Sequence, residues 1–314
     1  MILTVTLNPA IDRTYFVKDF SWNRTIRASQ SVVGVGGKGT DASCVLGELG
    51  YASLALGFAA GDTGRLMNRM MRKHGCKTDF VWVDGETRTN IVIISSESQG
   101  QSTVTEPGLQ IGMRELDKLK HKFSAALKKA SCVLIGGPVP PGLDASIYTE
   151  LVKQARQVGV PVVLDASGPG LKAGMEGRPT IAKPNVDEIA ELYGRPVTTV
   201  EEAYKAGREL QDKYGAALVI TLGKEGALAV LPGRAYRIPV LKIPVISTAG
   251  AGDAVLAGLV VALSAGNPIE AGLRTGFASA AAVCLSGATA DCCKADVERL
   301  LPQVELVEYV GERA

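Results

Sequence analysis

The chain has 314 residues, which is enough for one large α/β domain or two smaller ones. Apolar residues make up 46% of it and charged residues 21%, as in an ordinary globular protein. The net charge is only +2, and the lysines and arginines are scattered, which argues against a nucleic-acid partner or a membrane-binding surface.

The N-terminal residues 1–16 do not have the pattern of a secretion signal. They lack a basic start and reach Asp12 too early. The apolar stretch after Asp253 is shorter than the roughly 20 residues that a membrane span needs. We therefore expect a cytoplasmic protein.

Short β-branched runs alternate with helical patterns through most of the chain. Buried strands are predicted at 2–7, 52–58, 131–137, 160–166 and 216–223, and helices at 63–75, 145–159 and 201–215. Each of these helices ends at a glycine, which is a usual stop signal. The alternation predicts an α/β fold with a mostly parallel central sheet and helices on both faces.

Two segments, 12–35 and 87–106, break this alternation. Both are rich in alternating β-type residues and polar turns, which is typical of antiparallel hairpins. Two such hairpins could form one small sheet over the open edge of the main domain and act as a lid that excludes water. The alternative is that they are plain edge strands.

A glycine-rich segment, GVGGKGT, satisfies the pattern G-x-G-x-x-G with Gly34, Gly36 and Gly39. It follows a predicted hairpin rather than the first strand, so a dinucleotide-binding dehydrogenase is disfavoured. It is not a Walker A loop either, because Gly39 follows Lys38 where serine or threonine is required. We expect a turn that opens a helix at 40–50 and offers backbone N–H groups to an anionic or hydroxyl-rich ligand. A purely structural turn is the alternative.

Three later loops carry weaker signals. The glycine- and proline-rich loop 136–144 follows a predicted strand, at the edge where α/β proteins bind ligands. In 183-KPNVDE-188, Asn185 and Glu188 fit a helix capping box, or Glu188 could face magnesium while Lys183 and Asn185 lie near phosphate. In 219–230, the turn residues Thr221, Gly223 and Lys224 could line a nucleotide or form a simple hairpin.

The segment 248-TAGAGDAV-255 has the strongest chemical signal. The N–H groups of Gly250, Ala251 and Gly252 precede a long apolar helix, so they would lie at the positive end of its dipole. Such an anion hole suits the charge that develops on a phosphoryl group during transfer. The next residue, Asp253, could accept a proton from an attacking hydroxyl.

Cysteine and histidine offer little alternative chemistry. The six cysteines form no C-x-x-C pair, which favours buried free thiols over a zinc site. The two histidines, His74 and His121, lie in basic segments, which argues against a catalytic triad or a histidine metal site. Acid–base chemistry is therefore expected from carboxylates.

The motifs together resemble the ribokinase-like, PfkB-type carbohydrate kinases over essentially the whole chain. The resemblance rests on LNPAID at 7–12, GGKG at 36–39, ETR at 86–88, GGPVPPG at 136–142, KPNVDE at 183–188, TLGKEG at 221–226 and TAGAGD at 248–253. It implies a ribokinase-like three-layer αβα fold, with one kinase domain over 1–314 and a small β-sheet lid. The opening LTVTLNPAID is similar to the branch that acts on phosphorylated ketohexoses.

Family likeness also implies residue roles. On the reacting side it implies Asp253 as the catalytic base and an anion hole made by Gly250, Ala251 and Gly252. On the sugar side it implies Asp12, Gly36, Gly37, Lys38, Asp41, Arg88 and Arg27. On the nucleotide side it implies Lys183, Asn185, Thr221, Gly223 and Lys224, and near magnesium it implies Glu188, Asn185 and Asp165.

The chain departs from the family pattern at three positions: Asp41 stands where asparagine is usual, Val139 where serine is common, and Ala254 where serine or threonine is common. Asp41 could accept hydrogen bonds from a sugar but would repel a nearby phosphate. These departures leave the identity of the sugar open.

The resemblance predicts a kinase that uses ATP and Mg²⁺, with a sugar phosphate as its small-molecule partner. Because lid hairpins with apolar faces often pair between subunits, we expect a homodimer formed through the lid. The expected reaction is phosphorylation of fructose 1-phosphate to fructose 1,6-bisphosphate. Tagatose 6-phosphate and fructose 6-phosphate are the nearest alternatives. A kinase of an unphosphorylated sugar or nucleoside, and a non-catalytic sugar-phosphate sensor, also stay open.

Overall fold

A large twisted sheet forms the centre of the protein, whose computed structural model describes residues 1–98 and 100–311. Its strand order is β15-β14-β13-β12-β11-β10-β9-β1-β4-β5, with β6 also paired to β4. Neighbouring strands run parallel from β12 to β5, whereas β13, β14 and β15 add antiparallel pairs at the other end. The strands are β1 (Ile2–Thr6), β4 (Ser53–Ala59), β5 (Lys77–Thr78), β6 (Val81–Trp82), β9 (Cys132–Gly136), β10 (Val162–Asp165), β11 (Ile181–Ala182), β12 (Ala217–Thr221), β13 (Ala227–Leu231), β14 (Arg234–Ile238) and β15 (Val307–Glu308).

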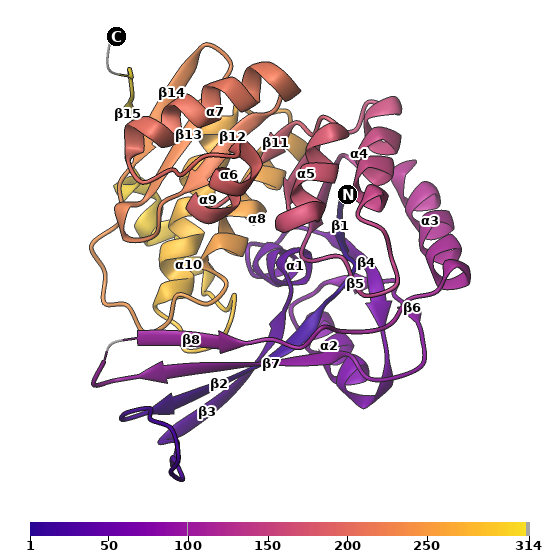
Figure 1. Cartoon of the computed structure of the whole chain (residues 1–314), viewed down its shortest axis with the longest axis vertical. Helices are drawn as coiled ribbons and strands as arrows, with labels where there is room; N and C mark the ends of the chain where they lie inside the picture. Colours follow the sequence, from indigo (N-terminus) through magenta and orange to yellow (C-terminus); the bar gives the residue numbers. More distant parts are fainter. Residues whose placement is uncertain (99, 312–314) are drawn as a thin grey trace.

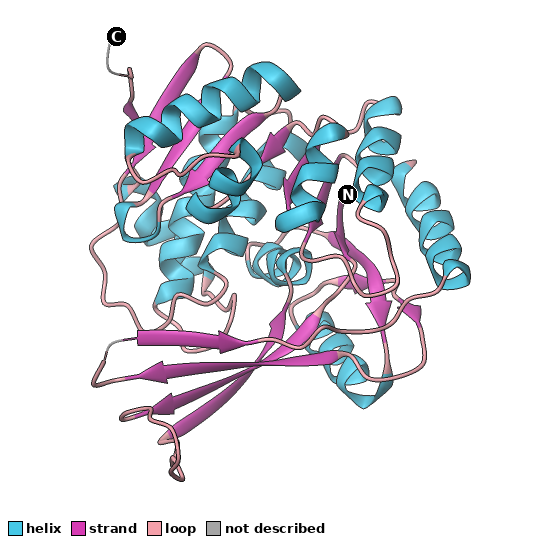
Figure 2. Cartoon of the chain, in the orientation of Figure 1, coloured by secondary structure: helices cyan, strands magenta, loops and turns pink. Residues whose placement is uncertain are grey.

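Helices cover both faces of this sheet (Figures 1 and 2). One face carries α3 (Met113–Leu127), α4 (Ser146–Gln157), α5 (Gly168–Glu176), α6 (Val186–Tyr193) and α7 (Val200–Tyr214). The other face carries α1 (Lys38–Glu48), α2 (Gly61–Lys73), α8 (Ala251–Ser264), α9 (Ile269–Cys284) and α10 (Lys294–Leu300). Strand side chains alternate between the two cores, so Leu3 and Val5 of β1 enter one while Ile2 enters the other.

A second, four-stranded sheet lies across one end of the main sheet (Figure 1). Its order is β3-β2-β7-β8, with β2 (Ala10–Val17), β3 (Gln30–Gly36), β7 (Arg88–Ser95) and β8 (Gly100–Val104). The pairs β2–β3 and β7–β8 are antiparallel hairpins, and β2 joins them by pairing in parallel with β7. Because β2 follows β1 directly, this small sheet stands beyond the carboxyl ends of the parallel strands.

These elements match most of the secondary structure that the sequence predicts. The five expected strands correspond to β1, β4, β9, β10 and β12, and the three expected helices correspond to α2, α4 and α7. One boundary differs, because α1 begins at Lys38 rather than at residue 40. Lys38 and Gly39 therefore belong to the first turn of the helix instead of the loop before it.

The cysteines are free thiols, but not all of them are buried. Cys44, Cys76, Cys132 and Cys292 are buried, Cys284 is half-buried and Cys293 is exposed. Within the described ranges no helix is long and apolar enough to cross a membrane.

Candidate active site

A deep cleft opens at the carboxyl ends of the parallel strands. Its volume is about 790 Å³. The residues that line it come from β12, α6, the loop before α8, α8 itself and α9. Ligands of open α/β sheets bind at this edge, because loops from several strands converge there.

The N-terminus of α8 supplies the expected anion hole and base. Gly250 is the N-cap residue with a φ of 80°, a left-handed conformation that favours glycine. The N–H of Ala251 donates to the carbonyl of Thr248 at 3.2 Å. Among the described residues, the N–H groups of Gly250 and Gly252 have no acceptor, so two amides rather than three are free for a ligand.

Asp253 stands in the first turn of α8, with its side chain partly accessible. Loss of water around the carboxyl and the charge of Asp165 raise its pKa to about 6, against the lowering effect of Lys38 and Lys183. At pH 7 to 8 Asp253 is therefore ionised but more basic than a surface carboxylate. This is the property that a general base needs.

Two lysines meet at one buried carboxylate beside the anion hole. Asp165, at the end of β10, is fully buried and forms ion pairs with Lys38 and, at 2.8 Å, with Lys183. Burial opposes ionisation, but the two ammonium groups hold the pKa of Asp165 below its usual value. A Cβ atom on Gly252 would lie 3.5 Å from the Nζ of Lys183, so this ammonium faces the free amides.

Lys38 therefore lies beside the carboxylates of Asp165 and Glu188, and not beside another of the cations predicted for the sugar side. Its Nζ is 3.6 Å from the Oε1 of Glu188. Burial lowers the pKa of Lys38, yet the carboxylates around it prevail and raise that pKa above its usual value, so the side chain is a permanent cation. Its position suits contact with a phosphoryl group during its transfer.

On the other side of Asp253, Asp12 is held by two hydrogen bonds. The Nδ2 of Asn90 donates to its Oδ1 at 2.8 Å, and the hydroxyl of Thr289 donates to its Oδ2 at 2.9 Å. Asp12 is 7% exposed, and burial raises its pKa despite these bonds. A Cβ on Gly36 would lie 2.2 Å from Asp12 Oδ1, so glycine at 36 is what leaves room for this carboxylate.

Gly37 has a similar steric role in the same turn. Its φ is 108°, and a Cβ there would lie 2.8 Å from the Oγ1 of Thr40. The hydroxyl of Thr40 donates back to the carbonyls of Gly36 and Gly37 and closes the turn. Glycine at 37 therefore allows this tight turn at the start of α1.

Arg88 is a buried cation without a carboxylate partner among the described residues. It begins β7, is 8% exposed, and donates to the carbonyls of Glu106 at 3.0 Å and Asn8 at 3.1 Å. Its Nε is buried and has no acceptor. A buried charge that has only carbonyl partners and one unused donor is well suited to an anionic ligand.

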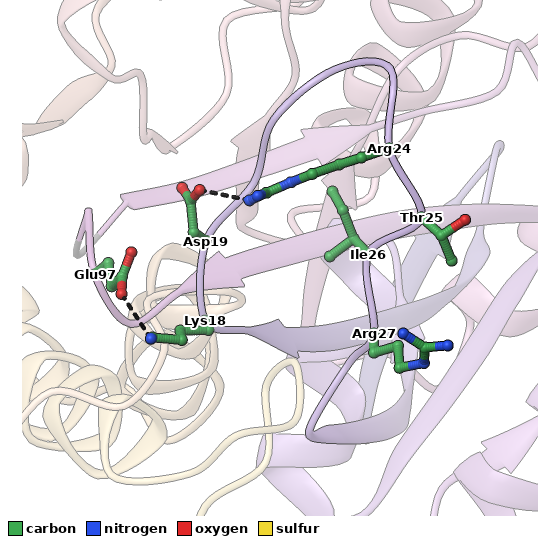
Figure 3. A pocket seen from close by; sticks show the side chains of 7 residues that line it. All are labelled: Lys18, Asp19, Arg24, Thr25, Ile26, Arg27 and Glu97. Carbon is green, nitrogen blue, oxygen red and sulfur yellow. Dashed lines mark hydrogen bonds and ion pairs between the residues drawn. The ribbon is translucent and has the colours of Figure 1, made fainter.

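Arg27 lies elsewhere, at the tip of the β2–β3 hairpin. It is exposed and lines a shallow hollow of about 280 Å³ with Lys18, Asp19, Arg24, Thr25, Ile26 and Glu97 (Figure 3). Two ion pairs, Arg24–Asp19 and Lys18–Glu97, cross this hollow. Within one chain, Arg27 and Arg88 are thus at different places on the small sheet.

The nucleotide-side residues meet in the large cleft. Asn185, Thr221, Gly223 and Lys224 line it, together with the apolar side chains of Val240, Leu241, Ile243, Val255, Phe277 and Ala281. The segment 219–230 is a hairpin in which β12 and β13 are joined by a short 3₁₀ turn. The predicted hairpin is therefore compatible with a turn that lines a nucleotide. An apolar slot beside polar groups suits a purine base.

The capping box at Asn185 is present. The Oδ1 of Asn185 accepts from the N–H of Glu188 at 2.8 Å, and Glu188 returns a bond to the N–H of Asn185 at 2.9 Å. In the described part of the chain, no group of three or more His, Cys, Asp or Glu could hold a metal ion. Asp165 is taken up by lysines, which leaves Glu188 as the carboxylate nearest to the phosphate side. A single carboxylate suits Mg²⁺ that arrives on nucleotide phosphates and keeps most of its waters.

Sequence reasoning missed two residues of this site. Asn90 could have been found, because it lies two positions after Arg88 in β7 and so shares its face. Its Oδ1 is buried without a hydrogen-bond donor among the described residues, so it could accept a hydrogen bond from a ligand. Thr289 gives no signal, because it reaches Asp12 from a loop 277 residues away.

This combination of fold and site has clear relatives. Residues 5–296 match the model of the pfkB family of carbohydrate kinases. The chain belongs to this family, which confirms the predicted fold class and kinase activity.

Individual relatives are similar over nearly the whole length. The 1-phosphofructokinase of Bacillus subtilis is 31% identical over 306 residues, covering 98% of this chain and 99% of that protein. A tagatose-6-phosphate kinase of Staphylococcus epidermidis is 32% identical over 267 residues, covering 84% and 85%. Among solved structures, a possible 1-phosphofructokinase of Thermotoga maritima has a TM-score of 0.88 at 29% identity, covering 98% of this chain and 99% of that one.

Proposed function

We propose that this kinase transfers the γ-phosphoryl group of ATP to a primary hydroxyl of a ketohexose phosphate, with fructose 1-phosphate as the preferred acceptor and fructose 1,6-bisphosphate as the product. The observation that carries this proposal is Arg88, a buried cation with an unused Nε and no carboxylate partner in the described chain. A neutral sugar would leave Arg88 with carbonyl hydrogen bonds and only the longer-range charges of carboxylates such as Asp12 and Glu106. The names of the relatives support the choice of sugar.

The residues around the anion hole divide the chemistry among them. Asp253 accepts the proton of the attacking hydroxyl, and Asp12 with Asn90 orients the sugar. The free amides of Gly250 and Gly252 and the ammonium group of Lys183 face the charge that grows on the phosphoryl oxygens. The ammonium group of Lys38 lies near the same phosphoryl position.

Magnesium would neutralise charge on the nucleotide phosphates when it is bound. We assign Glu188 to its neighbourhood, through water. Asp165 serves a different purpose in this proposal, because it anchors Lys38 and Lys183 in the positions from which they reach phosphate.

A coupled kinase assay over a panel of acceptors tests the proposal. The panel contains fructose 1-phosphate, fructose 6-phosphate, tagatose 6-phosphate, fructose and a nucleoside, each with saturating Mg-ATP. We expect the highest kcat/KM with fructose 1-phosphate. A best acceptor that carries no phosphate would overturn the assignment of Arg88, and ATP hydrolysis without any acceptor would point to a different class of enzyme.

Replacing Arg88 with methionine should raise KM for the sugar phosphate by about 30-fold. The change removes charge-assisted hydrogen bonds to phosphate, which are worth about 2 kcal/mol. KM for ATP should change little. Lys224, which lines the nucleotide end of the cleft, gives a matched control, since Lys224→Met should leave KM for the sugar phosphate unchanged. An Arg88→Met enzyme with unaltered KM would contradict a phosphate contact.

We also propose that the small sheet acts as a lid and that two copies of the chain associate through it in the cytoplasm. The small sheet and its hairpin carry exposed apolar side chains: Phe20, Trp22, Ile91 and Val104 are 43%, 83%, 40% and 60% exposed. Sedimentation equilibrium should give twice the chain mass of 32.8 kDa. Trp22→Ser together with Ile91→Ser should shift it toward the monomer, and an unchanged mass would exclude this surface.

A further inference from the structure

Asp41, which stands where the family usually has asparagine, is a carboxylate buried within the site. It lies in the first turn of α1 and is 2% exposed. The backbone N–H of Asp41 donates to the carbonyl of Gly37 at 2.8 Å, which fixes its position. Its Oδ1 is buried and has no hydrogen-bond donor. An ionised carboxylate oxygen in that condition is costly.

Its neighbour is the carboxyl group of Asp253. Helix α1 packs against α8, and the side chains of Asp41 and Asp253 lie within hydrogen-bonding reach of each other. Two ionised carboxylates have only acceptors to offer, so they repel at this distance. A single proton between them converts the repulsion into a hydrogen bond, as in other buried carboxyl pairs.

The surrounding charges decide which of the two holds the proton. The charged and titratable groups that face the pair are Asp12 from β2, Lys38 and Cys44 from α1, Arg88 from β7, Asp165 from β10 and Lys183 from the segment before α6. Lys38 and Lys183 favour the ionised form of Asp253. Asp41 instead experiences burial and the charges of Asp253 and Asp12, which raise its pKa well above the usual range. The proton therefore belongs to Asp41.

We propose that Asp41 is a positioning residue that remains protonated at neutral pH and donates a hydrogen bond to Asp253. The proposal rests on the proposed function for its catalytic consequence. The pair then carries one negative charge, held on the base. A protonated carboxyl has one donor and one carbonyl acceptor, so in this state Asp41 offers the same hydrogen-bonding groups as asparagine.

A neutral Asp41 also reduces the charge repulsion between the site and a phosphorylated sugar. Three ionised carboxylates, at Asp12, Asp41 and Asp253, would disfavour an acceptor that carries a phosphate dianion. With Asp41 neutral, the negative charge around Arg88 is reduced by one, so the phosphate meets less repulsion there. Above the pH at which Asp41 ionises, both the orientation of the base and this charge balance should be lost.

The pH dependence of kcat/KM for the sugar phosphate tests the catalytic part. In the wild-type enzyme we expect an acid limb near pH 6, where Asp253 gains a proton, and an alkaline limb, where the pair loses its shared proton. Asp41→Asn keeps a donor toward Asp253 but cannot titrate. Whatever its activity at neutral pH, its profile should lose the alkaline limb, extending its own active range by at least about one pH unit. Profiles that coincide on the alkaline side would overturn the proposal.

A second measurement needs no substrate, so it separates this inference from the proposed function. Below about pH 3 Asp41 is protonated in the folded and unfolded chains alike. At higher pH only the unfolded chain ionises it, so the wild-type fold loses stability relative to Asp41→Asn. The Tm of Asp41→Asn minus that of the wild type should therefore rise between pH 4 and 7, by roughly 3 °C or more.

The control is Asp212→Asn, on an exposed part of α7. It measures how the removal of one negative charge far from the site changes Tm. A Tm difference for Asp41→Asn that falls with pH would show that Asp41 is ionised in the folded protein, and would overturn the proposal even if the kinase assay fails. If the Tm difference rises with pH but the protein has no sugar kinase activity, the shared proton is established. Only its catalytic role is then rejected.

Discussion

Replacing Asp253 with asparagine is expected to lower turnover by at least about 100-fold, because general-base catalysis contributes roughly 10²- to 10⁴-fold. Asparagine has nearly the same shape but cannot take the proton of the attacking hydroxyl. The free amides of Gly250 and Gly252 and the ammonium of Lys183 are untouched, so KM for ATP should stay near the wild-type value. The measurement is kcat at saturating substrates at pH 8, where Asp253 of the wild type is ionised.

Loss of folding is excluded as an explanation by the direction of the stability change. The folded pKa of Asp253, about 6, lies above the value of about 3.9 in an unfolded chain. The stability that this carboxyl contributes therefore declines as the pH rises from about 4 to 6, and at pH 8 the ionised form is a cost to the fold. Asp253→Asn should consequently be at least as stable as the wild type at pH 8.

Asp187→Asn gives a matched control for the same chemical change. Asp187 lines the same cleft from the first turn of α6, and it should keep wild-type kcat at saturating ATP. Turnover of Asp253→Asn within a few-fold of the wild type would sink the assignment of the base. The acid limb of the pH profile would then belong to another group.

Local signals were enough to predict five strands of the main sheet and three of its covering helices. β1 and β9 are buried along their whole length because both faces of the parallel sheet are covered by helices. Thr221 and Asn185 follow strands whose carboxyl ends share one edge, and they meet through a β-bridge. The capping box at Asn185 depends only on residues three apart.

Features that depend on distant contacts could not be predicted. Thr289 reaches Asp12 across 277 positions, and no periodicity records such a contact. Lys38 was expected beside the sugar, but helix α1 starts early and directs it toward Asp165 and Glu188. The shared proton of Asp41 depends on burial and on Asp253, two properties that exist only in the folded chain.

The second large effect on turnover is expected from the substitution of a glycine in the anion hole. A Cβ on Gly252 would lie 3.5 Å from Lys183 Nζ, with no other heavy atom of the described residues within 4 Å apart from its sequence neighbours and helix backbone. It would point into the space between the free amides and the ammonium group, which the phosphoryl group must occupy to contact both. Gly252→Ala should therefore fold normally and lose about 100-fold in kcat, comparable to the loss of one donor from an oxyanion hole.

Gly250→Ala gives the contrasting result, because its Cβ would collide with the chain itself. That atom would lie 2.3 Å from the backbone nitrogen of Ala290, and the φ of 80° is unfavourable for alanine. We expect Gly250→Ala to lower Tm, whereas Gly252→Ala should keep the wild-type Tm. Thermal melts and kcat measured on both variants separate the two roles. Near-normal turnover of Gly252→Ala would place the transferring phosphoryl group outside this space, whereas a large fall in its Tm would mean that the methyl group is excluded by the protein rather than by the substrate.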